Sequence, residues 1–372
     1  MINVLRKSYV NFRGWSTKRK LLLIESDDWG SIRMPNREVY NLLLSKGLPV
    51  DRSRYSKFDT LESQTDLERL FETLAKVKDK NGNAASLTAN YLVANPDFEK
   101  IKQDDFKNYH YEDVFQTYGR YGDAATIKKL IVAGTKENVF YPQFHGREHL
   151  HPLRWLFSVN HCPNERLCFD HFAIPGVPLQ CAPETTKKFL ATYDYYNLEE
   201  KQFNEEALVD GLKMFEQIFG YPSKTFIAPQ SVRGEHVDGI LHKHGVLYHQ
   251  NGQQLLPSLE DKNNSAVNKY WGYKNDFGML YWRRNVTFEP SKNPNFDSVS
   301  SALSEIKNAF LFGKPAVINS HRVNFIGSIS EANQADSLGK LEQLLTKVVQ
   351  IWPDVEFVNS QQLGEYMTNT RK

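Results

Sequence analysis

Five polar side chains at three distant places in this sequence have the types and spacing of a hydrolytic metal site: Asp27, Asp28, His145, His149 and His321. Two histidines four residues apart, together with one carboxylate, can bind a divalent ion and leave a position open for water. An ion held this way activates water and polarises a carbonyl group. The second carboxylate could accept a proton from that water, and His321 could donate one to a leaving group, since an ordinary histidine has a pKa of about 6.5.

The elements that must position these residues are short apolar runs separated by helical segments. Runs bounded by Gly, Pro, Asn or charged residues predict buried strands at 21–24, 85–88, 139–144, 172–174, 225–228, 246–248, 279–282, 316–319 and 355–358. Helical periodicity predicts helices at 66–77, 205–219, 235–244, 299–312 and 337–352. Alternating strands and helices predict a parallel sheet that forms a closed or nearly closed α/β barrel. In such barrels reactive residues follow the C-terminal strand ends, so the five polar residues are expected to converge on one rim.

Composition and length favour one globular domain over residues 1–372. The 372 residues contain no repeat, low-complexity segment or Gly/Ser-rich linker. A formal net charge of +2 lacks the positive field expected of a nucleic-acid binder, so no nucleic-acid partner is predicted. The composition makes no prediction about the oligomeric state.

The N-terminal residues and the cysteines bear on location. The first twenty residues are basic but contain no apolar stretch long enough for a secretory signal or a membrane span, so we expect a cytoplasmic protein without a membrane span. The three cysteines, Cys162, Cys168 and Cys181, match no zinc-binding pattern and are expected to be free thiols.

The polar clusters form three motifs whose order and spacing resemble those of a known family. Asp27-Asp28 follows the first predicted strand, His145-x-x-x-His149 follows the third, and His321 follows a late one. This arrangement resembles the polysaccharide deacetylases, the NodB-homology group of carbohydrate esterases. The resemblance covers residues 20–365 and implies a distorted (β/α)7–8 barrel that removes N- or O-acetyl groups from a carbohydrate.

The resemblance also implies a role for each motif residue. Asp27 would be the general base and His321 the general acid. Asp28, His145 and His149 would be the metal ligands. Zn²⁺ is the expected ion, and Co²⁺, Ni²⁺ and Fe²⁺ suit the same donors.

The sequence departs from the family pattern at two motifs. Trp29 stands where the family usually has Gly after the two aspartates, so Trp29 is expected to reshape the rim or a sugar subsite. Ile227 stands where the family has an Arg that orients the base, and Arg233 is a candidate to replace it by reaching back. Three further arginines are candidates for binding substrate or orienting a carboxylate: Arg33, Arg147 and Arg322. For Arg147 and Arg322 a surface ion pair is the alternative.

Two other interpretations of the motifs stay open. His145-x-x-Glu148-His149 also matches the inverted zincin peptidases, in which Glu148 would be the base and both histidines would share one helical face. Gly146 and Pro142 weaken such a helix. The second alternative is a catalytically degenerate barrel that binds carbohydrate, for which the aromatic residues would provide stacking surfaces.

Overall fold

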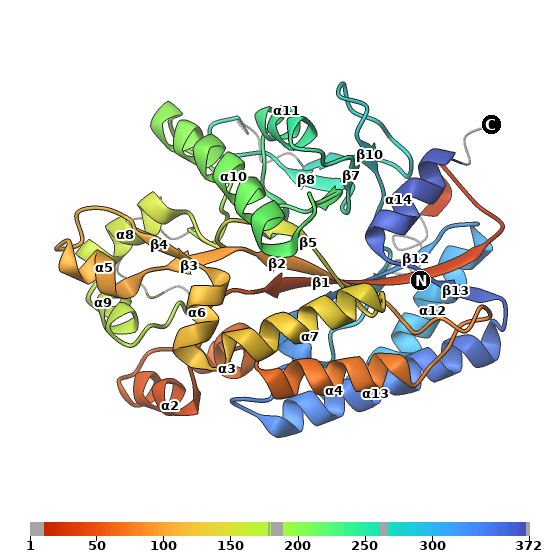
Figure 1. Ribbon diagram of the computed structural model, residues 1–372, viewed down its shortest axis with the longest axis horizontal. Coiled ribbons are helices and arrows are strands. Elements are labelled where there is room, and N and C mark those ends of the chain that lie inside the picture. Colours follow the sequence, from red (N-terminus) through yellow and green to blue (C-terminus); the bar gives the residue numbers. More distant parts are fainter. Residues whose placement is uncertain (1–10, 178, 180–188, 261–265, 370–372) are drawn as a thin grey trace.

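The fold is built on a nine-stranded sheet in which every described pairing is parallel. The computed structural model describes residues 11–177, 179, 189–260 and 266–369 (Figure 1). The strand order is β10-β7-β6-β5-β2-β1-β12-β11, and β13 pairs with the start of β1. The strands are β1 (Lys20–Trp29), β2 (Leu87–Leu92), β5 (Phe140–Gly146), β6 (Thr225–Phe226), β7 (Tyr248–His249), β10 (Leu280–Tyr281), β11 (Val286–Thr287), β12 (Ala316–His321) and β13 (Val355–Phe357).

The sheet is an open half-barrel whose two end strands are neighbours in the chain. Residues 282–285 are all that separates β10, at one end of the strand order, from β11 at the other. At the start of this connection the backbone N–H of Trp282 donates to His249 O (3.2 Å), and at its end the N–H of Asn285 donates to Val317 O (3.2 Å). Within the described residues no ladder pairs β10 with β11. The predicted α/β barrel architecture is therefore confirmed, in its incompletely closed form.

Helices cover the sheet. They are α2 (Arg37–Ser45), α3 (Arg54–Phe58), α4 (Gln64–Ala75), α5 (Phe98–Gln103), α6 (Val114–Tyr121), α7 (Ala124–Lys136), α8 (Pro152–His161), α9 (Pro163–Asp170), α10 (Leu198–Phe219), α11 (His236–Lys243), α12 (Ser298–Leu311), α13 (Glu331–Ile351) and α14 (Ser360–Asn369). α4 contacts both α7 and α13, and these three helices run side by side in Figure 1. Two short antiparallel hairpins complete the fold: β3 (Ala94–Pro96) with β4 (Tyr111–Asp113), and β8 (Gln253–Leu255) with β9 (Ala266–Asn268).

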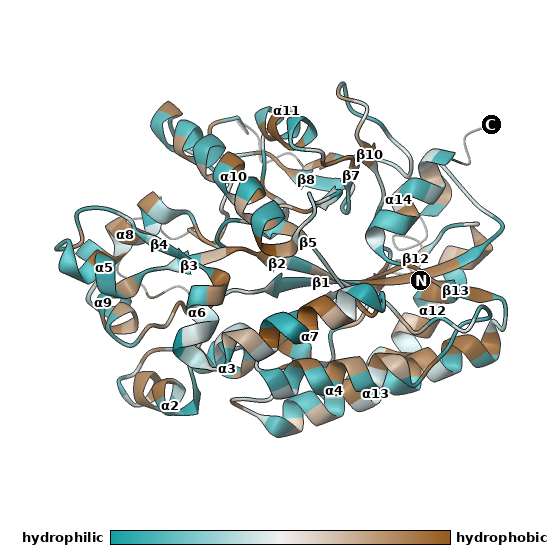
Figure 2. Ribbon diagram, viewed as in Figure 1, coloured by the Kyte–Doolittle hydropathy of each residue, from teal (hydrophilic) through white to brown (hydrophobic). Residues whose placement is uncertain are grey.

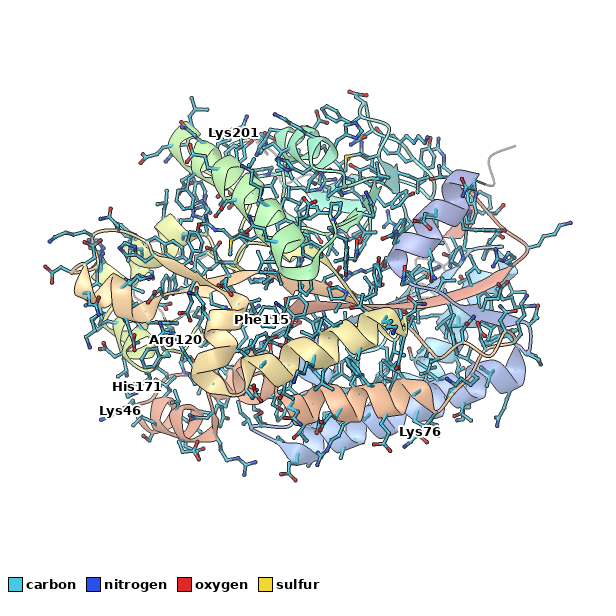
Figure 3. The ribbon with its side chains drawn as sticks, viewed as in Figure 1. Lys46, Lys76, Phe115, Arg120, His171 and Lys201 are labelled. Atoms are coloured by element: carbon cyan, nitrogen blue, oxygen red, sulfur yellow. The ribbon has the colours of Figure 1, made fainter. Side chains whose placement is uncertain are left out.

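The long helices begin and end at sequence signals. α4 starts with a capping box in which the side chains of Ser63 and Asp66 satisfy each other's backbone N–H groups. α10 is capped at its N-terminus by Asn197 and at its C-terminus by Gly220, whose φ of 80° is a left-handed conformation that glycine adopts without steric cost. The inner face of α10 is apolar and buried, whereas its outer side is hydrophilic in Figure 2. Charged residues such as Lys46 and Lys76 project from the periphery in Figure 3.

Two predictions about local structure need correction. Residues 172–174 do not form a strand; they follow α9 irregularly, with Ile174 N–H bonded to Arg33 O at 2.8 Å. The free-thiol prediction holds for Cys168, which is buried, but is wrong for Cys162, which is disulfide-bonded. Cys181 lies outside the described residues. None of the helices in the described ranges is long and apolar enough to cross a membrane.

Candidate active site

The five predicted residues lie together at the C-terminal ends of β1, β5 and β12. Since β1 and β12 are neighbours, Asp27 and His321 face each other in the strand register. All five line one cavity of about 600 Å³. The predicted convergence therefore follows from the sheet order, which the sequence could not supply by itself.

A left-handed turn brings both aspartates into this cavity. Side chains of successive strand residues point to opposite faces, so Asp27 and Asp28 could not both line the cavity on a regular strand. The pairing of β1 with β2 shifts register between Ser26 and Trp29, and Asp28 has a φ of 76°. This conformation is strained for a residue other than glycine, and such strain persists only where neighbours enforce it. At Gly30 the backbone N–H donates to both carboxylate oxygens of Glu62 (3.0 and 3.2 Å), which fixes the turn.

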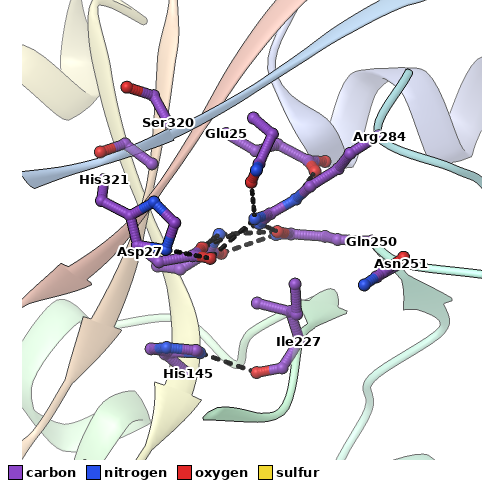
Figure 4. Close-up of polar contacts among 12 residues, drawn as sticks. Glu25, Asp27, His145, Ile227, Gln250, Asn251, Arg284, Ser320 and His321 are labelled. Carbon is purple, nitrogen blue, oxygen red and sulfur yellow. Dashed lines mark hydrogen bonds and ion pairs between the residues drawn. The ribbon is translucent and has the colours of Figure 1, made fainter. Parts of the chain in front are cut away.

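Asp28, His145 and His149 form a buried donor set that fits a divalent ion. Their ligand atoms all lie within 4.8 Å of one another. The Nε2 atoms of His149 and His145 lie 3.2 and 3.7 Å from the same oxygen, Oδ1 of Asp28. Tetrahedral coordination with bonds of about 2.1 Å requires similar separations, about 3.4 Å. His145 Nδ1 donates to the carbonyl of Ile227 (2.8 Å), so its Nε2 keeps a free lone pair (Figure 4).

The charge states of this donor set also suit a metal. Burial lowers the pKa of His149 to about 4, so its imidazole is neutral at pH 7, which is the form that binds metal. Burial raises the pKa of Asp28, but His149 and Arg33 outweigh that effect and hold the pKa well below its usual range.

Asp27 is held as a carboxylate by Arg284. The two terminal nitrogens of Arg284 donate to the two oxygens of Asp27 at 2.7 and 2.8 Å, and Asn90 Nδ2 donates to Oδ1 at 2.7 Å (Figure 4). Burial raises the pKa of Asp27, but the charge and hydrogen bonds of Arg284 outweigh it and keep the pKa well below its usual range. Asp27 is therefore ionised at neutral pH and can accept hydrogen bonds.

His321 is held as a cation by Glu289. Its Nδ1 donates to Oε1 of Glu289, whose other oxygen accepts from Arg54 Nη1 (2.6 Å) and Asn324 Nδ2 (2.8 Å). Burial lowers the pKa of His321, but Glu289 more than compensates and raises it to about 9. The Nε2 of His321 lies 3.9 Å from Oδ2 of Asp27, so a protonated acid and an ionised base share the cavity.

Two residues of the site, Arg284 and Glu289, were not predicted from the sequence. Arg284 binds Asp27 in the place for which Arg233 was predicted. Arg284 is the second residue after the predicted strand 279–282. Reactive residues were expected at the C-terminal ends of strands, and applying that expectation here would have selected Arg284. Glu289 had no such signal, because β11 is only two residues long.

Two of the predicted arginines lie elsewhere. Arg233 does not reach back to the base; its guanidinium is buried against Asp238 and the Tyr281 hydroxyl (2.8 Å). Arg322 is completely buried, and its Nε and Nη2 donate to the two oxygens of Asp59 at 3.0 Å each. Neither lines the cavity, so the substrate-binding prediction for Arg322 and the base-orienting prediction for Arg233 are corrected.

The arrangement required for an inverted zincin is not formed. His145 lies on strand β5, and residues 147–151 are irregular rather than helical. Glu148 is buried away from the cavity, where its Oε1 accepts from Arg147 Nε (2.8 Å) and the Tyr109 hydroxyl (3.1 Å). Arg147 therefore binds Glu148, and its Nη1 also donates to Oδ2 of Asp210 at 3.1 Å.

The two remaining candidates are Trp29 and Arg33, and only Arg33 lines the cavity. Trp29 is a core residue: its ring packs edge-on against Phe140 and its Nε1 donates to Ser26 Oγ (3.0 Å). The predicted rim or subsite role of Trp29 is therefore wrong, since its indole does not line the cavity. Arg33 does line the cavity, with its Nη2 3.4 Å from Oδ2 of Asp28.

No protein-family model and no curated protein matches the chain. Solved structures align with nearly all of it. A candidate polysaccharide deacetylase from Mycobacterium smegmatis is 13% identical with a TM-score of 0.42, over 96% of this chain and 94% of its own. A candidate glycoside hydrolase/deacetylase from Parabacteroides distasonis is 11% identical with a TM-score of 0.48, over 97% and 74%. An allantoinase is 10% identical with a TM-score of 0.47, over 96% and 93%. The family that the motifs resemble is thus represented among the solved structures that align with this chain.

Proposed function

We propose that this chain is a metal-dependent hydrolase, a single domain over residues 1–372, that removes an acetyl group from a sugar. The observation that carries the proposal is that a carboxylate bound by a cation and a histidine bound by an anion lie close together in one polar cavity. Asp27 is held ionised by Arg284, and His321 is held protonated by Glu289, with 3.9 Å between the two groups. A general base and a general acid of an acyl-transfer reaction need these two states at neutral pH.

A metal-dependent hydrolase also needs ligands for its ion, and the neighbouring donor set provides them. Asp28, His145 and His149 would hold the ion, for which Zn²⁺ is the first choice and Co²⁺, Ni²⁺ and Fe²⁺ are alternatives. When bound, the ion polarises the acyl carbonyl and lowers the pKa of water in the site.

The chain's own residues then move the protons. Asp27 accepts the proton of the attacking water, because Arg284 orients both of its oxygens. His321 donates its Nε2 proton to the leaving nitrogen or oxygen of the sugar, since its Nδ1 is already bonded to Glu289. The polar lining of the cavity, which includes Gln230, Asn251 and Gln253, suits a hydroxyl-rich substrate.

Metal content and acetate release test the proposal together. We expect inductively coupled plasma mass spectrometry to find about one divalent ion per chain and the His145→Ala variant to lose it. The matched control is His161→Ala, which changes an exposed histidine on α8. Acetylated sugar oligomers should release acetate with the wild-type protein, and Asp27→Asn should retain the metal while losing activity.

Three outcomes would contradict the proposal or part of it. A wild-type chain that stays metal-free after incubation with zinc, cobalt and nickel lacks the hydrolytic centre. Full activity in Asp27→Asn would remove the assignment of the base. A metal-loaded protein that binds acetylated sugars without releasing acetate would instead be a degenerate binding barrel.

A further inference from the structure

Arg33 is a buried cation with almost no counter-charge. Its side chain is 5% exposed, and its only ion-pair contact among the described residues is 3.4 Å long, to Oδ2 of Asp28. Its Nε is buried without a hydrogen-bond partner. Arg322, which is buried to a similar degree, makes three hydrogen bonds of 2.7–3.0 Å to two carboxylates. The guanidinium carbon also lies 5.8 Å from the centre of the Tyr55 ring. A buried guanidinium with so few polar partners is costly, so it is a site where an anion would be stabilised.

The neighbouring metal site makes this imbalance larger. Oδ1 of Asp28 faces the two histidines, so the carboxylate that contacts Arg33 is also the one that would hold the ion. A dication there takes up the negative charge of Asp28 and leaves Arg33 without compensation. Asp59, the other nearby carboxylate, is already bound at both oxygens by Arg322.

The rest of the cavity lining does not supply the missing anion. Asp27 is the only other carboxylate among the residues described as lining the cavity, and it is paired with Arg284. A guanidinium presents a planar fork that matches the two oxygens of a carboxylate or a phosphate.

We infer that Arg33 forms an anion-binding subsite beside the metal-binding residues, and that the substrate carries a carboxylate or phosphate group close to the acetyl group that is removed. The inference about the substrate rests on the proposed deacetylase function. The subsite itself depends only on Arg33 and its surroundings.

The first test measures binding without catalysis. Isothermal titration calorimetry on the zinc-loaded protein should detect binding of glucuronate, inorganic phosphate or both. Arg33→Gln should weaken that binding about tenfold or more, because a hydrogen bond to a charged group is lost. Arg33→Lys should retain part of it. Arg52→Gln, which removes an exposed arginine outside the cavity, should behave as wild type. Zinc affinity, measured separately, should stay the same or rise in Arg33→Gln, since a positive charge near the ion is removed.

The second test compares acetylated sugars. Acetate release is measured from neutral N-acetylglucosamine oligomers, from N-acetylmuramate as the carboxylate form and from N-acetylglucosamine 6-phosphate. We expect a higher kcat/KM for one of the acidic sugars, and the identity of that sugar separates the carboxylate from the phosphate. Arg33→Gln should abolish the preference, so that kcat/KM for the acidic sugar falls to the value that the same variant shows for the neutral sugar.

The outcomes separate the anion-binding subsite from the deacetylase function. Equal loss on neutral and acidic sugars in Arg33→Gln would mean that Arg33 only positions Asp28, and would overturn the subsite. Acetate release from neutral sugars alone, with no anion binding, would overturn the subsite and leave the deacetylase function standing. Anion binding that depends on Arg33, without acetate release from any sugar, would support the subsite and overturn the deacetylase function.

Discussion

Replacing Glu289 by Gln should shift the titration of His321 by more than two pH units. The charge and the hydrogen bond of Glu289 are the largest of the effects that raise the pKa of His321 to about 9, and the charges of Asp27 and Asp28 add to them. Without the charge of Glu289, burial opposes the remaining effect of the two aspartates, so the pKa should fall to about 6.5. At pH 8 the protonated fraction would then drop from about 90% to about 3%, a roughly thirtyfold loss of the acid form.

The pKa of His321 can be followed without any substrate. Titration of the imidazole signals by nuclear magnetic resonance reports it directly, and His321→Ala identifies the resonance. With a substrate, activity should decline as pH rises through about 9 in the wild type and through about 6.5 in Glu289→Gln, because a general acid must carry its proton. Glu38→Gln, an exposed change on α2, is the matched control.

The same pair has a stability signature with a defined sign. A raised histidine pKa contributes stability that is complete below the unfolded value of about 6.5 and is lost as pH rises through about 9. Glu289 has a lowered pKa, so its contribution is lost as pH falls below the ordinary glutamate range. The unfolding free energy that Glu289→Gln removes should therefore be greatest between about pH 5 and 6.5, roughly 3 kcal/mol. A His321 pKa that stays near 9 in Glu289→Gln would refute this account of the acid.

Three further changes test other parts of the site and the core. Arg284→Met leaves the buried carboxylates of Asp27 and Glu25 without their shared cation and should cost about 3–5 kcal/mol in urea unfolding, partly restored by adding Asp27→Asn. Zinc at about 100 times its Kd should raise the unfolding free energy of the wild type by about 2.7 kcal/mol and leave that of His145→Ala unchanged, as thermal unfolding with and without chelator will measure. His151 is fully buried, and burial lowers its pKa to about 4, so acidification from pH 7 to 5 should cost the wild type roughly 2 kcal/mol that His151→Leu does not lose.

Each of these three has an outcome that would contradict it. An unchanged unfolding free energy in Arg284→Met would mean that the two carboxylates do not depend on that guanidinium. A zinc-induced shift that survives in His145→Ala would place the ion elsewhere. An equally steep acid limb in His151→Leu would assign that loss of stability to other groups.

The sequence was informative where strands are long and buried on both faces. Strands β1, β5 and β12 appear as continuous apolar runs, so the positions of Asp27, His145 and His321 at their ends could be predicted. The turn that lets Asp28 point into the cavity could not, because a φ of 76° at an aspartate depends on contacts with Glu62 far along the chain.

The sequence was least informative where function depends on how the sheet ends meet. β10 and β11 have two residues each, too few for a periodic signal. Arg284 could therefore be identified as the partner of Asp27 only from the strand order. Arg233 is closer along the chain to Ile227, where the family has its orienting Arg, yet Arg233 pairs with Asp238, whereas Arg284, which lies between β10 and β11, pairs with Asp27.

The residues on either side of β11 include both partners of the predicted base and acid, Arg284 and Glu289. Arg284 precedes β11 and holds Asp27 ionised, and Glu289 follows β11 and holds His321 protonated. β11 is itself paired with β12, which carries His321, and Arg284 also donates to Asn319 on β12 at 2.8 Å. A displacement of β11 along β12 would thus move the partners of the base and the acid together. The geometry of the half-barrel opening and the proton chemistry of the site are therefore coupled through one short strand.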